Sequence, residues 1–135
     1  MTSVLIDSNV LLDVMTEDAA WSAWSSNALA QAADRYRLVV NPVIYAEVSV
    51  RYSKIEELDA ALPKAMIERE PLPYDAAFLA VKAFLSYRRR AGTKTSPLPD
   101  FFIGAHAAIA GYQLLTRDAA RFRTYFPKLP LIAPA

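Results

Sequence analysis

The sequence contains no cysteine, only three glycines and a single histidine among its 135 residues. Without cysteine the chain forms no disulfide bond, offers no thiolate nucleophile and builds no cysteine-ligated zinc site. This composition is compatible with a reducing cytosol, and we predict a cytoplasmic protein.

The sequence also lacks a long apolar run and a large excess of charge of either sign. No apolar run approaches the roughly 18 residues of a membrane span, and Asp7 and Asp13 interrupt the segment that would form the core of a signal peptide. We therefore expect a soluble protein that keeps its N-terminus and has no membrane partner. Because the formal net charge is only +1, affinity for nucleic acid must come from local patches of charge.

Apolar residues are abundant. They make up 54% of the chain, which is above the usual share. A chain of 135 residues is long enough for one domain with its own core, and we predict a single domain over residues 1–135. Much of the excess is alanine, which favours tight helix packing, and the rest is available for a partner.

Short apolar runs alternate with segments of helical periodicity along the chain. The runs predict strands near residues 4–6, 38–40, 114–115 and 131–132. Apolar residues at helical spacing predict helices after residue 9, over 18–37, from 42, over about 54–65, over 75–90, from 100 and around 122–126. This alternation predicts a parallel α/β sandwich.

Four acidic residues follow from this arrangement as candidates for one site. Asp7 and Asp118 each come just after an apolar strand, so both should lie at the same edge of a parallel sheet. Glu47 is about a turn and a half into the helix after the second strand, and Asp100 begins a helix rich in alanine and glycine. A carboxylate after a strand also serves as a helix cap. Acidic residues arriving from separate parts of the chain favour a shared site instead.

A cluster of carboxylates has a definite chemical consequence. Two unpaired carboxylates about 4 Å apart repel each other by roughly 4 kcal/mol at an effective dielectric constant near 20. The cluster is therefore unfavourable unless protons or a cation neutralise it. The available ligands are hard oxygens, which favours Mg²⁺ or Mn²⁺ over zinc. Such ions activate water and hold phosphodiester oxygens, so a metal-dependent phosphodiesterase is one hypothesis.

Four stretches of the sequence resemble the motifs of PIN domains. The run Val4–Asp13 looks like the opening strand with its Asp-x-Asn signature, and Glu47 within Tyr45–Val48 resembles the second acidic residue. The runs Pro99–Ala107 and Leu115–Asp118 are similar to the third and fourth motifs. The match covers nearly the whole chain in order, and the chain length is similar to that of VapC toxins of toxin–antitoxin pairs.

The resemblance implies a fold, an activity and partners. The fold is a three-layer α/β/α sandwich with a short central parallel sheet. The activity is that of a Mg²⁺- or Mn²⁺-dependent endoribonuclease, held inactive by a VapB-type antitoxin and forming a homodimer. By the same match Asp7, Glu47, Asp100 and Asp118 become catalytic residues, with Asp7, Asp100 and Asp118 as metal ligands. Asn9 and Thr116 become the groups that orient these carboxylates.

The sequence context also predicts the place of several other residues. The sequence predicts that His106, among small apolar residues on a helix, is a packed structural residue, and that Asp13 faces solvent or a partner. Two basic groups, Arg88–Arg90 with Lys94 and Arg117 with Arg121 and Arg123, either guide an RNA backbone or solvate helix ends. Tyr45 and Tyr112 are either core residues or platforms for a base.

Two other functions remain open at this level. A phosphatase with Asp7 as nucleophile needs a second aspartate two residues later, where this chain has Asn9. A catalytically silent protein-binding module would use its carboxylates as caps and dock a partner on Trp21 and Trp24. We also expect the loop Gly92–Pro99 to border the substrate path. The apolar surface around the two tryptophans and helix 54–65 should receive the antitoxin or a second copy of the chain.

Overall fold

The computed structural model describes residues 2–90 and 98–135. The strands are β1 (Ser3–Ile6), β2 (Arg37–Val40), β3 (Ile67–Arg69), β4 (Gln113–Leu115) and β5 (Leu131–Ile132). The helices are α1 (Ser8–Met15), α2 (Ser22–Arg35), α3 (Pro42–Ser49), α4 (Ile55–Ala61), α5 (Tyr74–Arg90), α6 (Leu98–Ala110) and α7 (Ala120–Tyr125).

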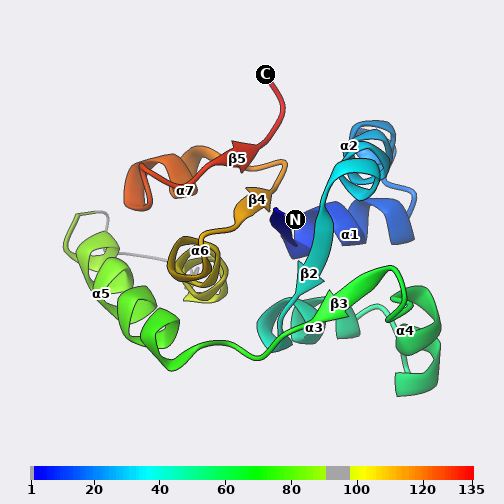
Figure 1. Ribbon diagram of the computed structural model, residues 1–135, viewed down its shortest axis with the longest axis horizontal. Coiled ribbons are helices and arrows are strands. Elements are labelled where there is room, and N and C mark those ends of the chain that lie inside the picture. Colours follow the sequence, from blue (N-terminus) through cyan, green and yellow to red (C-terminus); the bar gives the residue numbers. More distant parts are fainter. Residues whose placement is uncertain (1, 91–97) are drawn as a thin grey trace.

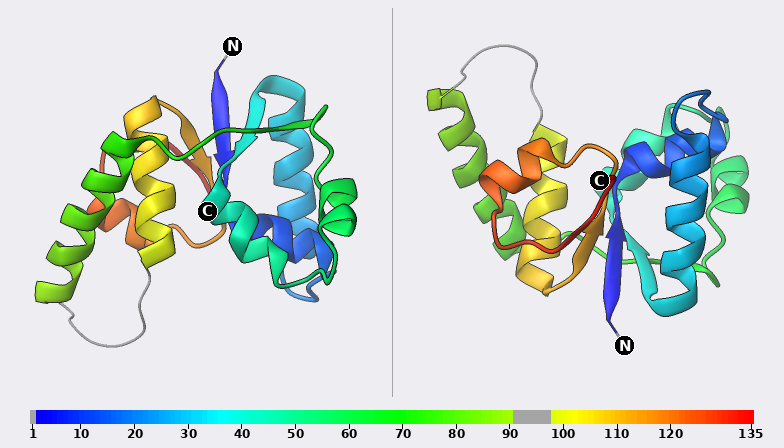
Figure 2. Two further views of the ribbon diagram at one scale, coloured as in Figure 1. Left: turned by 90° about the horizontal axis from the view of Figure 1, so that it is seen from below. Right: turned by 90° about the horizontal axis from the view of Figure 1, so that it is seen from above.

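The strands form one parallel sheet in the order β3-β2-β1-β4-β5. The apolar run Val4–Ile6 is fully buried at the centre of this sheet, as a strand covered on both faces requires. Helices α5, α6 and α7 lie on one side of β1, and α1 to α4 lie on the other (Figures 1 and 2). The predicted three-layer α/β/α sandwich is confirmed.

Strand β3 is the one element of the described residues for which the sequence pattern predicts nothing. Its three residues include two charged ones, Glu68 and Arg69, and only Ile67 is buried. An edge strand this short has no apolar run to reveal it. Backbone pairing with β2 defines it, and the pairing continues as the Glu70 N–H donates to the Val40 carbonyl over 3.0 Å.

Three helices also have boundaries that differ from the prediction. The helix expected over 18–37 is α2, which covers only Ser22–Arg35, because Arg37 begins β2. The helix expected over 54–65 is α4, which ends at Ala61, because Pro63 follows two residues later and the position before a proline disfavours helical geometry. Helix α6 begins at Leu98. Asp100 therefore lies within its first turn instead of opening it.

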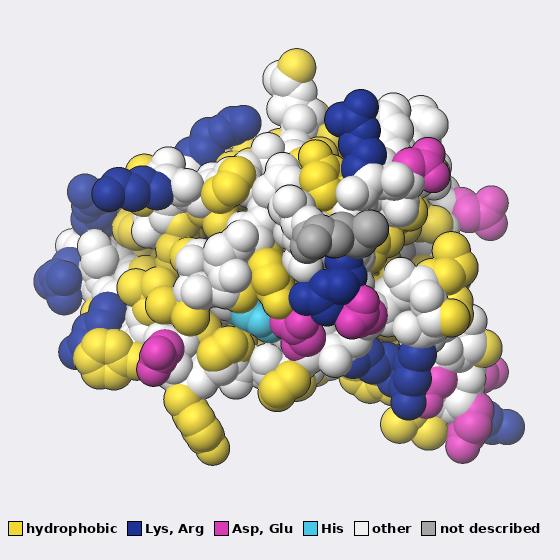
Figure 3. All heavy atoms as spheres, in the orientation of Figure 1, with side chains coloured by type: hydrophobic (Ala, Val, Ile, Leu, Met, Phe, Trp, Pro, Cys, Tyr) yellow, Lys and Arg dark blue, Asp and Glu magenta, His cyan; other side chains and the backbone are white. Residues whose placement is uncertain are grey.

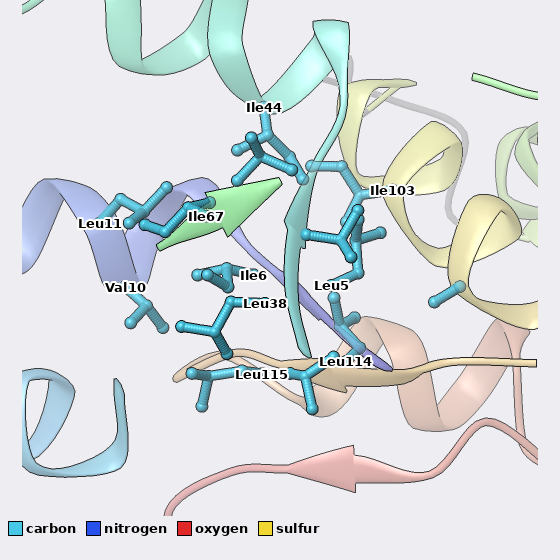
Figure 4. Close-up of a cluster of buried hydrophobic side chains, with 14 of the residues drawn as sticks. Leu5, Ile6, Val10, Leu11, Leu38, Ile44, Ile67, Ile103, Leu114 and Leu115 are labelled. Atoms are coloured by element: carbon cyan, nitrogen blue, oxygen red, sulfur yellow. The ribbon is translucent and has the colours of Figure 1, made fainter. Parts of the chain in front are cut away.

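One apolar cluster joins the sheet to the helices that carry the candidate site residues. Leu5 and Leu114 lie in the same cluster as Ile44 from α3 and Ile103 from α6 (Figure 4). All four side chains are fully buried. Because core packing is dense and resists displacement, this cluster fixes α3 and α6 against the sheet.

Gly104 allows α6 to pack closely against the C-terminal part of the chain. A Cβ atom at this position would lie 2.6 Å from Phe126 Cε2 and 3.1 Å from Phe122 Cδ1. Both rings are buried, so they cannot move into solvent without exposing apolar surface.

We predict that Gly104→Ala destabilises the protein although alanine is the better helix former. Helix propensity contributes about 1 kcal/mol in favour of alanine, whereas overpacking a dense core costs typically 1–3 kcal/mol. Thermal unfolding should show a lower Tm for Gly104→Ala. Adding Phe126→Leu should recover part of that loss through the space it creates. A Gly104→Ala variant more stable than the wild type would contradict this account.

Candidate active site

The candidate site lies at the carboxyl end of β1, the central strand, which has β2 on one side and β4 on the other. The chain moves from β1 to β2 on one side, while β4 pairs with the other side of β1. In open parallel sheets such a point leaves a crevice at the carboxyl ends of the strands, where ligands bind. Asp7 follows β1 and Asp118 follows β4, and the two strands pair in parallel, so both residues lie at this edge of the sheet.

Asp7 is held by the segment that follows β4. Its side chain is only 3% exposed, and Oδ2 accepts a hydrogen bond of 2.8 Å from the Thr116 hydroxyl. The Asp7 side chain makes no capping hydrogen bond to α1. The helix-cap interpretation of Asp7 is therefore wrong for this side chain, which instead points toward the loop after β4.

Thr116 and Asn9 link the two strand ends. The Asn9 amide donates to Thr116 Oγ1 over 3.3 Å, and the Asp118 backbone N–H donates to the same oxygen over 3.1 Å. Thr116 thus receives two hydrogen bonds while it donates its own to Asp7. These contacts fit the orienting role that the resemblance implies for Asn9 and Thr116.

Glu47 and Asp100 approach the site from helices on opposite sides of the sheet. The Ser8 hydroxyl donates to Glu47 Oε1 over 2.7 Å, which connects α3 to the start of α1. The Arg121 guanidinium forms an ion pair with Asp100 and so connects α7 to the start of α6. Each of the two half-buried carboxylates therefore has a partner close to the strand ends.

The charges of the four carboxylates act on one another. The pKa of Asp7 is raised to about 7. Burial is the main cause, the charges of Asp100 and Glu47 add to it, and the hydrogen bond from Thr116 acts in the opposite direction. Burial also raises the pKa of Glu47, and the Asp100 charge adds to this effect. For Asp100, burial raises the pKa, Arg121 lowers it, and the charge of Asp118 raises it. The charges of Asp100 and Glu47 thus reach Asp7, and Asp118 is connected to this group through its effect on Asp100.

The donor set fits a hard divalent cation. All four side chains offer carboxylate oxygens, the ligands that Mg²⁺ and Mn²⁺ prefer. The repulsion between their charges, which adds to the effect of burial on the pKa values of Asp7, Glu47 and Asp100, would be relieved by a cation. As placed, no three acidic or histidine side chains within residues 2–90 and 98–135 are arranged to enclose a metal ion. Glu47 and Asp100 turn instead to Ser8 and Arg121.

The prediction for Asp13 is wrong. Asp13 was expected to face solvent or a partner, but only 3% of it is exposed. Its Oδ2 accepts hydrogen bonds of 2.7 Å from both Ser25 Oγ and Arg117 Nε. The sequence does contain a signal for this position, because Asp13 follows Val10 by three residues and so shares the buried face of α1.

His106 is the packed structural residue that the sequence predicts. The Asn41 amide lies 2.9 Å from His106 Nδ1, and Nε2 faces Glu70 Oε1 at 3.7 Å. Burial lowers the pKa of His106. Asn41 also caps α3, since its Oδ1 accepts from the Ile44 backbone N–H. His106 therefore supports the helix that carries Glu47 and makes no hydrogen bond or ion pair with Asp7, Glu47, Asp100 or Asp118.

The basic residues and the two tyrosines named in the sequence analysis differ in whether their polar groups are already bound. Arg117 and Arg121 are engaged in ion pairs with aspartates, whereas Arg88–Arg90 are exposed at the end of α5. Basic side chains gather at the end of the molecule where α5 and α7 lie (Figure 3). The hydroxyls of Tyr45 and Tyr112 are bound to Asp59 and Glu70. Most of the loop expected to border the substrate path, residues 92–97, lies outside the described residues.

The chain belongs to the PIN domain family, whose model matches residues 4–126. Its structure is similar to VapBC2 from Rickettsia felis (TM-score 0.71, 15% identity) and VapBC-1 from nontypeable Haemophilus influenzae (TM-score 0.71, 16% identity). It is also similar to a toxin–antitoxin complex from Klebsiella pneumoniae (TM-score 0.62, 20% identity). Each match covers 98% of both chains. No curated protein matches the sequence.

Proposed function

We propose that this protein is a metal-dependent endoribonuclease of the VapC type, the toxin of a toxin–antitoxin pair. The observation that supports the proposal most directly is the convergence of Asp7, Glu47, Asp100 and Asp118 on one edge of the sheet of a PIN domain. The likeness to structures described as toxin–antitoxin complexes supports the second half of the proposal. We further propose a cytoplasmic homodimer.

In this proposal Asp7, Asp100 and Asp118 hold Mg²⁺ or Mn²⁺. The ion supplies a Lewis acid for the phosphodiester oxygens and lowers the pKa of the attacking water. Glu47 takes the proton of that water, a role favoured by the raised pKa of its half-buried carboxyl. Attack of the deprotonated water on phosphorus would break the P–O3′ bond. It would leave a 5′ phosphate and a 3′ oxygen that takes a proton from solvent water to become a 3′ hydroxyl. Thr116 and Asn9 keep Asp7 oriented through the hydrogen bonds already described.

Digestion of an RNA pool tests this function directly. The wild type should cut RNA in Mn²⁺ or Mg²⁺ and not in EDTA, and sequencing of the fragments should show 5′ phosphates. An Asp-nucleophile phosphatase would instead release phosphate from p-nitrophenyl phosphate. A silent binding module would show neither activity and no metal binding by calorimetry. Intact RNA under all metal conditions would exclude the proposal.

We predict that Arg121→Gln strengthens metal binding while it slightly weakens the metal-free fold. Arg121 neutralises Asp100 through a partly exposed ion pair, and such pairs contribute about 0–1 kcal/mol. Removing the guanidinium leaves Asp100 free for a cation, so the dissociation constant for Mn²⁺ should fall by up to about fivefold. Calorimetry measures this change, with Arg123→Gln on the same helix as control. Unchanged Mn²⁺ affinity in Arg121→Gln would show that the ion pair does not compete with the metal.

An antitoxin needs an apolar surface outside the catalytic edge. The structure shows Trp24 packed against the core, so it is less available than the sequence analysis expected. The end of α3 and the start of α4 expose Val50 (83%) and Ile55 (62%). Val50 lines an open depression of about 560 Å³, whose other lining residues are Met15, Arg51, Tyr52, Ser53 and Glu57. We place the antitoxin contact here, adjoining helix 54–65 as the sequence predicts.

We predict that Val50→Ser with Ile55→Ser prevents capture of the antitoxin without loss of stability, because both side chains are largely exposed. The probe is the product of the small reading frame neighbouring the gene, co-expressed with a tagged toxin. Phe78→Ser, an equally exposed apolar position on α5, is the matched control. Normal capture by the double variant together with lost capture by the control would move the contact to α5.

A further inference from the structure

One buried carboxylate near the catalytic edge has no part in the proposed chemistry. Asp13 lies in α1 six residues after Asp7 and accepts hydrogen bonds from Ser25 in α2 and from Arg117. Burying a charge is unfavourable unless it is paired and hydrogen-bonded. Both conditions are met here by contacts of 2.7 Å, so the position of the Arg117 guanidinium is closely defined.

Arg117 is also fixed from its other side and along its backbone. The guanidinium carbon lies 5.4 Å from the ring centre of Trp21, in cation–π geometry. The backbone N–H of Arg117 faces Asn9 Oδ1 at 3.4 Å. Together with the bond from Thr116 to Asp7, these contacts attach the segment after β4 to α1, to the turn before α2 and to the end of β1.

Asp118, the next residue, is placed differently. It is exposed, and no hydrogen bond or ion pair among the described residues holds its carboxylate. Its backbone N–H donates to Thr116 Oγ1 over 3.1 Å, and its backbone carbonyl accepts from the same hydroxyl at 3.5 Å. The position of the Asp118 carboxylate therefore depends on the backbone of the segment. Arg117 attaches that backbone to α1 through Asp13 and to the turn before α2 through Trp21, in addition to the contact of Thr116 with Asn9.

We propose that Asp13 and Arg117 are positioning residues that set the Asp118 carboxylate relative to Asp7 and Asp100. The inference rests on the proposed function, in which Asp118 is a metal ligand. An arginine suits this role because its planar guanidinium accepts one orientation when it both pairs through Nε and stacks on a ring. Loss of a partner that orients a metal ligand typically lowers metal affinity or activity by about 10–100-fold.

Mn²⁺ binding in a double-mutant cycle tests the inference. The four proteins are the wild type, Arg117→Gln, Asp118→Asn and the double variant, and calorimetry gives the dissociation constant for Mn²⁺. Arg117→Gln should weaken Mn²⁺ binding by about tenfold in the wild-type background. It should have no further effect once Asp118 is replaced, because it acts through that carboxylate. Asp13→Asn, which keeps the shape of the side chain, should reproduce the effect of Arg117→Gln.

Arg37→Gln is the matched control. Arg37 is also a partly exposed arginine in ion pairs, with Glu68 and Glu70, and its side-chain exposure of 29% is close to the 31% of Arg117. It lies away from the four carboxylates, so its replacement should lower the Tm and leave Mn²⁺ affinity unchanged. With RNA as substrate, Arg117→Gln should lower kcat by about tenfold and leave KM nearly constant.

The outcomes separate this inference from the proposed function. Suppose that the wild type binds Mn²⁺ and cuts RNA. If Arg117→Gln then binds Mn²⁺ normally, or loses the same factor of Mn²⁺ affinity in both backgrounds, Arg117 is only structural and the inference is overturned. A wild type that neither binds Mn²⁺ nor cuts RNA overturns both. A loss confined to the background that retains Asp118 supports the positioning role.

Discussion

The Asp7→Asn variant is expected to cut RNA slower than the wild type by about a hundredfold or more and to lose most of its stabilisation by Mn²⁺. Asparagine keeps the shape of the side chain and still accepts the hydrogen bond from Thr116. It removes the anionic oxygen that a hard cation prefers. A ligand that binds only the folded protein stabilises it by about 1.4 kcal/mol for each tenfold excess over its Kd. Melting curves in EDTA and in Mn²⁺, with one RNA digestion, measure both effects.

Asp59→Asn provides the control for this experiment. Asp59 forms an ion pair with Arg69 and accepts from Tyr45, away from the catalytic edge. Its replacement should leave cleavage and the response to Mn²⁺ unchanged. If Asp7→Asn were to cut RNA at the wild-type rate, or gain the same Tm in Mn²⁺, Asp7 would not be a metal ligand and the proposed mechanism would be wrong.

The second large effect is on the pH dependence of the metal-free protein. Asp7 has its usual pKa of 3.8 in the unfolded chain and a pKa of about 7 when folded. Between these values the folded state binds the proton more tightly, so the free energy of unfolding decreases as the pH rises. This difference between the folded and unfolded pKa values changes the free energy of unfolding by about 4 kcal/mol at most. The raised pKa values of Glu47 and Asp100 act in the same direction.

Comparison with Asp7→Asn isolates this contribution. His106 acts in the opposite direction, because burial lowers its pKa and the unfolded chain then binds the proton more tightly. We therefore expect the stability of Asp7→Asn relative to the wild type to increase from pH 5 to pH 8 in EDTA, as measured by urea unfolding. In saturating Mn²⁺ the stability of the wild type should instead increase with pH, because metal binding requires deprotonated ligands. Parallel pH profiles in EDTA would show that Asp7 titrates normally in the folded protein.

The sequence contains the information that places Asp7 and Asp118, because a buried strand followed by a carboxylate is a local pattern. Parallel pairing of β1 with β4 then brings the two residues to the same edge. Glu47 and Asp100 were selected through the motifs that surround them, and their place at this edge depends on how α3 and α6 pack. Local periodicity gives the existence of these helices but not their distance from the sheet.

The contacts that the sequence did not reveal are pairs between distant residues. Arg121 with Asp100 and Arg117 with Asp13 join segments whose approach is decided only by the tertiary fold. Strand β3 was missed for a related reason, since its pairing with β2 defines it rather than its own residues. Asp13 differs from these cases. Its helical spacing from Val10 indicated burial, but the charge of the side chain suggested the opposite.

The position of β1 has a consequence for how the protein is made. β1 is the first strand to be synthesised, yet it lies at the centre of the sheet, and its pairing partner β4 begins at Gln113. Thr116, which holds Asp7, is 109 residues away along the chain. Because a ribosome releases the N-terminal part first, a growing chain has β1 unpaired on one side and lacks Asp118. The edge that carries Asp7 and Asp118 is completed only when the segment after β4 has left the ribosome. Under the proposed function, the nascent chain therefore has no complete site during most of its synthesis.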